Sequence, residues 1–151
     1  MRHKSVRKAV ADFESPSIDS VEELVSAVSG MYGKPIYLEA LDEANWGPLT
    51  AFLDESADAV TIYYRIQDTP QYRLQCICHE LGHLVMGSSC ALPFDVHLAD
   101  QVDIPAGSLR LQARDLRDTD VEREAEEFSF SVIRHLRNQL RRRTRLGEAF
   151  A

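Results

Sequence analysis

The chain has 151 residues, of which 44% are hydrophobic and 27% are charged, and its formal net charge is −7. This length predicts a single domain over residues 1–151 that can bury one core without disulfides, with residues 1–16 and 144–151 expected to be flexible. The acidic balance argues against nucleic-acid binding as the main activity, and we find no signal peptide and no apolar run of membrane-spanning length, so we expect a cytoplasmic protein.

The first half of the chain predicts one helix followed by three strands. Ser20 is a good helix N-cap with Glu23 at capping-box spacing, and the helix is expected to end at Gly30 or Gly33. The residues that follow alternate between β-branched or aromatic runs and short polar links. The expected strands cover residues 35–41, 49–53 and 59–64. Short links favour a small, mostly antiparallel sheet.

The second half predicts two long helices. Asp68-Thr69-Pro70 begins a helix that runs to Met86 and ends at Gly87, and its apolar residues on more than one face indicate a buried, central element. Residues 88–117 are interrupted by Pro and Gly, with a short helix expected over 109–116. A last helix, from residue 119 or 120 to 143, carries one apolar stripe. The fold class is therefore α+β.

The central helix contains the motif His79-Glu80-Leu81-Gly82-His83. Histidines four residues apart lie on one helix face, where two neutral imidazoles suit Zn²⁺. Glu80 lies to one side of such an ion and is predicted to act as general base toward a water that the metal activates. The alternative is a helix with two incidental histidines, but two unpartnered imidazoles on a buried helix would be costly. This motif favours a zincin-like arrangement, with the sheet packed on the HExxH helix.

A catalytic zinc needs a third protein ligand. The longer pattern HExxHxxGxxH is excluded, because Met86 and Ser89 stand where it requires Gly and His. The remaining candidates are His97, His135, Asp95, Asp100 and the acids of the last helix. We select Glu122 and keep His97 as the runner-up ligand or as a stabiliser of the transition state. His135 is interpreted as a surface or interhelical residue.

Glu122 has two interpretations. It lies on the flank of the apolar stripe and aligns with Glu126, which could accept a hydrogen bond from the far nitrogen of a ligand histidine. Thr119 and Glu122 also have capping-box spacing, so Glu122 could instead cap its helix. Spacing alone fits both.

With these motifs the chain resembles the ImmA/IrrE family of small bacterial metallopeptidases. The resemblance covers residues 18–140 and depends on HELGH at 79–83 followed by E-x-x-A-x-x-F at 122–128. It implies His79, His83 and Glu122 as zinc ligands and Glu80 as general base. Two departures are Ser129, where the family usually has Ala, and Glu126, where it often has Asn or Asp.

The resemblance also implies a function. Family members inactivate a specific partner, commonly a DNA-binding transcriptional repressor, and so switch on genes of a mobile element or a stress response. We therefore expect a zinc endopeptidase acting on such a repressor, without direct nucleic-acid or membrane contact. The alternative is a non-catalytic regulatory binding module, such as an antirepressor or toxin–antitoxin component, with a structural metal.

Two further features were weighed. Arginines gather between residues 134 and 145; we interpret them as a solvated helix end where cations suit the helix dipole, the alternative being a docking site for an acidic partner or a nucleic-acid backbone. The three cysteines are Cys76, Cys78 and Cys90. They are interpreted as small apolar residues in a reducing compartment, because Cys78 cannot face the metal beside His79 on a regular helix.

Overall fold

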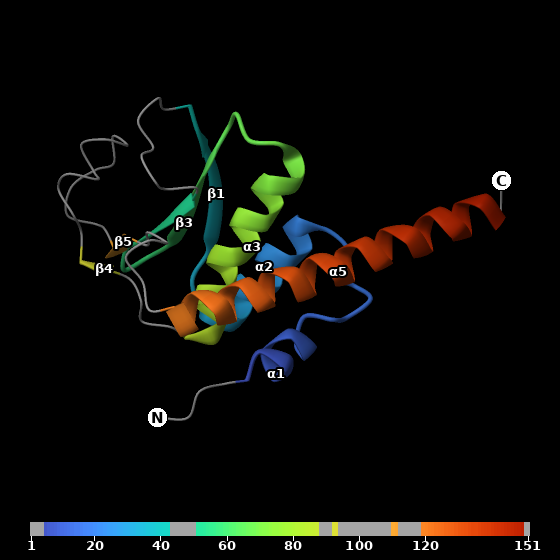
Figure 1. The fold of residues 1–151 in the computed structure, drawn as a ribbon, viewed down its shortest axis with the longest axis horizontal. Coiled ribbons are helices and arrows are strands. Elements are labelled where there is room, and N and C mark those ends of the chain that lie inside the picture. The colour runs from blue at the N-terminus through green and yellow to red at the C-terminus, as the bar shows by residue number, and fades with distance from the viewer. Residues whose placement is uncertain (1–4, 43–50, 88–91, 94–109, 112–118, 150–151) are drawn as a thin grey trace.

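In the computed structural model, the residues described are 5–42, 51–87, 92–93, 110–111 and 119–149. They form an α+β fold in which the HELGH helix packs against a small three-stranded sheet and the other helices pack around that helix (Figure 1). Helix α2 (Val21–Tyr32) agrees with the predicted one: the Ser20 hydroxyl accepts a hydrogen bond from the Glu23 amide, and Gly33 ends the helix in the left-handed conformation at φ 88°. The sequence analysis predicted no element before it, but the structure has helix α1 (Val6–Ala11) there. Ala9 and Val10 of α1 are buried.

The three-stranded sheet is mixed, so the prediction of a mostly antiparallel sheet is wrong. Its strands are β1 (Ile36–Leu41), β2 (Ala51–Glu55) and β3 (Val60–Arg65), in the order β1-β3-β2. β2 and β3 form an antiparallel hairpin, whereas β1 runs parallel to β3. The prediction assumed that successive strands are neighbours. Here β1 and β2 are consecutive in the sequence but not neighbours in the sheet, because β3 lies between them.

The helix that carries the HELGH motif is α3 (Pro70–Met86), and its predicted bounds are confirmed. The Thr69 hydroxyl accepts a hydrogen bond from the Tyr72 amide, Pro70 follows at the first helical position, and Gly87 ends the helix at φ 64°. Every residue from Cys76 to Val85 is buried. This helix packs against α2, β2 and β3 as well as against α5, so it is the centre of the molecule, as predicted.

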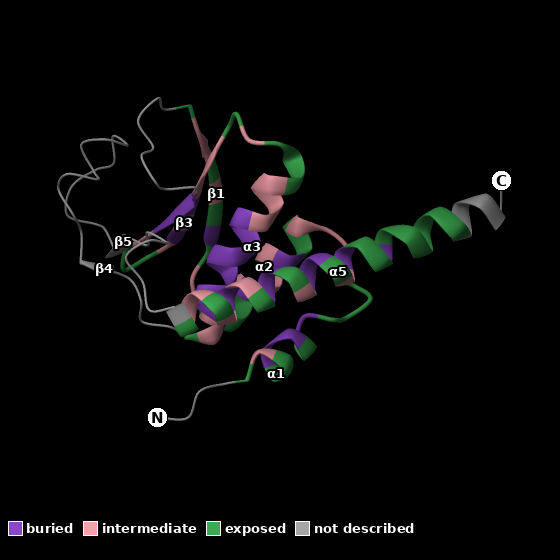
Figure 2. Cartoon of the chain, viewed as in Figure 1, coloured by how far each residue is buried: buried purple, intermediate pink, exposed green. Residues whose placement is uncertain are grey.

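The last helix, α5 (Thr119–Ala149), is longer than predicted and extends well past the rest of the molecule (Figure 1). Figure 2 shows buried residues on α5 where it crosses α3 and exposed residues along its far end. Phe128 is fully buried and meets Phe13 edge to face, with ring centroids 5.9 Å apart. Farther along, the Gln139 amide donates a hydrogen bond to the Pro16 carbonyl at 2.9 Å. These contacts fix α5 over the core and over the segment that precedes α2.

A second, two-stranded sheet pairs β4 (Leu92–Pro93) with β5 (Arg110–Leu111) in antiparallel fashion. The short helix predicted over 109–116 is therefore wrong at residues 110–111, where the chain is extended; its remainder lies outside the described residues. Among the residues described, no helix combines the length and the apolar character needed to cross a bilayer.

Candidate metal centre

Helices α3 and α5 run antiparallel along a shared interface, and the HELGH histidines face it. Gln75 contacts Glu126 and Ser129, whereas His79 and His83, farther along α3, contact Glu122 near the start of α5. Because Gln75 and His79 are four residues apart, they lie on the same face of α3. The interface therefore brings two turns of acidic side chains on α5 opposite the two histidines.

Gly82, inside the motif, lets the two helices approach closely. A Cβ at this position would lie 3.0 Å from the Ala125 carbonyl oxygen and 3.1 Å from both the Ala125 Cα and a Phe128 ring carbon. Backbone atoms cannot move aside as the end of a flexible side chain can. The absence of a side chain at Gly82 and the small side chain of Ala125 thus set the helix separation at which Glu122 reaches the histidines.

Three side chains converge at this interface. The Nε2 atoms of His79 and His83 are 3.1 Å apart, and Glu122 places Oε2 2.7 Å from the first and Oε1 3.2 Å from the second. Both imidazoles are almost completely buried. Ligand atoms about 2.0–2.1 Å from a tetrahedral zinc are separated from one another by roughly 3.3 Å. The separations of 3.1 and 3.2 Å are therefore close to those of a zinc ligand set, and the separation of 2.7 Å is shorter.

Glu126 determines which nitrogen of His79 carries the proton. Its Oε2 lies 2.9 Å from His79 Nδ1, and a carboxylate can only accept, so Nδ1 is the protonated nitrogen. Gln75 donates from its side-chain amide to the other oxygen of Glu126 at 3.3 Å. In a neutral imidazole this arrangement leaves the Nε2 lone pair directed at Glu122 and His83. The predicted role of Glu126 is consistent with this geometry.

This arrangement calls for a cation among the three groups. With Nδ1 protonated, His79 Nε2 is an acceptor, and it lies 2.7 Å from a carboxylate oxygen, which is also an acceptor. Two acceptors at that distance repel each other unless a proton or a metal ion lies between them. The ligand atoms of His79, Glu80 and His83 all lie within 4.8 Å of one another, and this buried group could hold a metal ion.

The charge of Glu122 is favoured by its neighbours. Burial alone would raise the pKa of this carboxyl. When protons lie between the groups, hydrogen bonds from His79 and His83 outweigh burial and lower the pKa of Glu122 to about 2. Glu122 is therefore ionised at neutral pH, as a metal ligand must be. Because its two oxygens face the two imidazoles, the structure favours the ligand interpretation of Glu122 over the helix-cap interpretation.

None of the other candidate ligands lies at this centre in the part of the chain that the structure describes. His97, Asp95 and Asp100 lie outside those residues. His135 is distant: its Nε2 donates to the carbonyls of Ser15 and Ile18, each at 3.0 Å, which agrees with its interpretation as an interhelical residue.

Cys78, beside His79, behaves as a buried apolar group. Desolvation raises the pKa of its thiol to about 12, so the thiol is protonated at neutral pH.

Sequence reasoning missed two residues that build the centre, Gln75 and Gly82. Gln75 had a usable signal, because it precedes His79 by one helical turn. The contact of Gly82 with α5 had none, because it depends on how two distant segments pack. Taken together, the centre combines histidines that could hold a metal ion with a nearby carboxylate, Glu80. No family model, no curated protein and no solved structure matches this chain.

Proposed function

We propose that this protein is a zinc-dependent endopeptidase. The observation that carries the proposal is the convergence of His79 Nε2, His83 Nε2 and the Glu122 carboxylate, with Glu80 next to them on the same helix. Two imidazoles and one carboxylate are a ligand set typical of catalytic zinc, which keeps one position open. A structural zinc site usually has four protein ligands, often with cysteine, whereas the group of described residues that could hold a metal here contains no cysteine.

Each residue of the candidate metal centre has its own role in this proposal. His79, His83 and Glu122 would hold the ion, and Glu126 and Gln75 would keep His79 in the tautomer that binds it. When bound, zinc lowers the pKa of a coordinated water to about 7 and polarises a carbonyl group. Glu80 would take the proton of the attacking water on a carboxylate oxygen and pass it to the leaving amine nitrogen.

The substrate in this proposal is a specific protein partner, a DNA-binding transcriptional repressor whose cleavage switches on genes of a mobile element or a stress response. The support for this part is the resemblance of the two motifs, at 79–83 and 122–128, to the ImmA/IrrE family. The substrate assignment is therefore separable from the peptidase assignment, and each has its own test.

Glu80→Gln tests the peptidase activity. Zinc-loaded wild-type protein is incubated with a proteome-derived peptide library, and new N-termini are counted by mass spectrometry. Because the amide cannot accept a proton, we expect the variant to bind zinc with unchanged stoichiometry and to cleave at least about 100-fold more slowly. Glu127→Gln, an exposed carboxylate on α5, is the matched control and should cleave as wild type does.

A variant Glu80→Gln that cleaves at the wild-type rate would contradict the proposal. Absence of any zinc-dependent cleavage, combined with inactivation of a co-expressed repressor, would instead support the non-catalytic binding module. Chelation should abolish the wild-type activity, and added zinc should restore it.

A further inference from the structure

A hollow of about 500 Å³ opens at the other end of the α3–α5 interface from the metal centre. Helix α3 contributes Tyr72 and Gln75, and the α5 side is lined by Phe130, Ile133, Arg134 and Arg137. Gln75 belongs to both places, because its side chain lines the hollow and its amide holds Glu126 at the metal centre. This size lies within the range of ordinary ligand-binding pockets.

The hollow is positively charged. Arg134 and Arg137 are three residues apart, so both project from one face of α5, and both are exposed. Among the residues described, neither guanidinium has a carboxylate within ion-pair distance, unlike Arg143, which pairs with Asp19. Arginine offers paired donors that match a carboxylate. The two free guanidiniums therefore provide binding positions for anionic groups.

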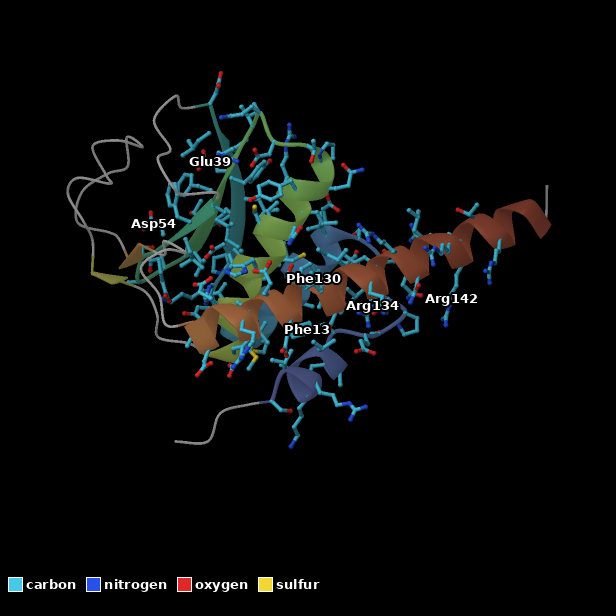
Figure 3. All side chains as sticks on the ribbon, viewed as in Figure 1. Phe13, Glu39, Asp54, Phe130, Arg134 and Arg142 are labelled. Atoms are coloured by element: carbon cyan, nitrogen blue, oxygen red, sulfur yellow. The ribbon has the colours of Figure 1, made fainter. Side chains whose placement is uncertain are left out.

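The hollow also has an apolar wall. Phe130 is 50% exposed although it is a large aromatic residue, and it lies between this hollow and a second one lined by Val6, Val10 and Arg134. Figure 3 shows Phe130 and Arg134 near each other on α5, with Arg142 farther along the helix. An exposed aromatic beside arginines is the composition of binding hot spots in protein interfaces.

We propose that this hollow docks an acidic segment of the protein substrate, with carboxylates on Arg134 and Arg137 and an apolar side chain against Phe130. This inference rests on the proposed peptidase function and adds the class of sequence that the enzyme selects. The exposed aromatic ring of Phe130 suits the apolar side chain of a peptide, which a phosphate backbone lacks.

The position of the hollow suits a substrate that continues to the metal centre. Tyr72 and His79 are seven residues apart on α3, which is about 10 Å along the helix axis. An extended peptide covers that length in roughly three residues. A segment docked in the hollow would thus need about three further residues to reach the level of His79 along α3.

The test is a peptide selection on the full chain, made inactive by Glu80→Gln and loaded with zinc so that no peptide is cleaved. A displayed library of random peptides is enriched on this protein. We expect the enriched peptides to share Asp or Glu residues next to one apolar residue. A double charge reversal, Arg134→Glu with Arg137→Glu, should weaken the best peptide by about 30-fold or more.

The matched control is Arg142→Glu with Arg145→Glu, which changes the net charge equally but outside the hollow. It should weaken the same peptide by less than about threefold, since exposed rim charges contribute little. Enriched peptides without an acidic preference, equal weakening by both double variants, or preferential retention of random duplex DNA would each overturn the docking proposal. Zinc-dependent cleavage by the wild-type enzyme is measured separately, so the peptidase function can stand if docking fails.

Discussion

The two halves of α5 have opposite characters. In residues 119–133, Glu122 and Glu126 contact the histidines of α3, and Ala125, Phe128 and Ser129 are completely buried. In residues 134–149, six arginines occur with no acid before position 148, and every residue from Leu140 to Arg145 is exposed. One continuous helix therefore supplies acidic side chains to the buried candidate metal centre at one end and a solvated cationic surface at the other.

This difference shows that charge pattern alone does not identify a site. Acids at the start and cations at the end of a helix both suit its dipole, so both halves fit a purely structural explanation. What distinguishes the first half is the contacts of its acids with buried imidazoles at 2.7–3.2 Å. What distinguishes the arginines of the hollow is that they lie beside an exposed phenylalanine.

The largest effect is expected from Glu122→Ala. Losing one of three protein ligands should lower zinc affinity by more than about 100-fold, which exceeds the usual cost of an outer hydrogen bond. If Glu122 were only a helix cap, the variant would lose about 1 kcal/mol of stability and keep its zinc. Competition with a fluorescent chelator, run beside Glu127→Ala as the control on the same helix, separates the two cases.

Gly82→Ala should separate α3 from α5. Its Cβ would meet the Ala125 backbone at 3.0–3.1 Å, and overpacking of this kind costs about 1–3 kcal/mol. Zinc affinity should fall with stability, since Glu122 moves away with α5. Gly30→Ala, on α2, has no atom within 4 Å of the added Cβ and should be neutral or up to about 1 kcal/mol stabilising. Equal urea midpoints for the two variants would refute this account of the interface.

Glu126→Ala should weaken zinc binding by about 10–100-fold, because His79 loses the partner that holds its Nδ1 proton. Gln75→Ala, which removes only the support of Glu126, should have a smaller effect in the same direction. Isothermal titration of the metal-free proteins with zinc gives both values. An effect of Gln75→Ala larger than that of Glu126→Ala would contradict the proposed order, in which Gln75 supports Glu126 and Glu126 supports His79.

The smallest effect is expected in the exposed half of the helix. Leu140→Ala and Arg142→Ala should each change the free energy of unfolding by less than about 0.5 kcal/mol, because Leu140 is 62% exposed and Arg142 is exposed too. Urea denaturation measures this directly. A loss above about 1 kcal/mol for either variant would mean that the helix beyond Gln139 also contributes to the core.

The sequence predicted local features well and long-range ones poorly. The caps at Ser20, Thr69 and Gly87 can be recognised from residue types that are close together in the sequence. The start of α2 and both bounds of α3 follow from them. The parallel pairing of β1 with β3 joins strands that are not consecutive in the sequence, which no local pattern contains.

The site divides in the same way. The histidine pair and the helix face that it shares follow from helical spacing. For Glu122, the spacing fitted both a metal ligand and a helix cap. The approach of Ala125 to Gly82 follows only from tertiary packing, and it is this approach that brings Glu122 to the histidines. The buried residues of α1 had no visible signal, because a six-residue helix carries too short a pattern.

The most direct test of the metal centre is zinc K-edge X-ray absorption of the zinc-loaded protein, compared with Glu122→Ala. The account predicts two imidazole nitrogens and carboxylate or water oxygen at about 2.0–2.1 Å, with one carboxylate ligand lost in the variant. A sulfur ligand at about 2.3 Å, or a wild-type spectrum unchanged by the substitution, would contradict it.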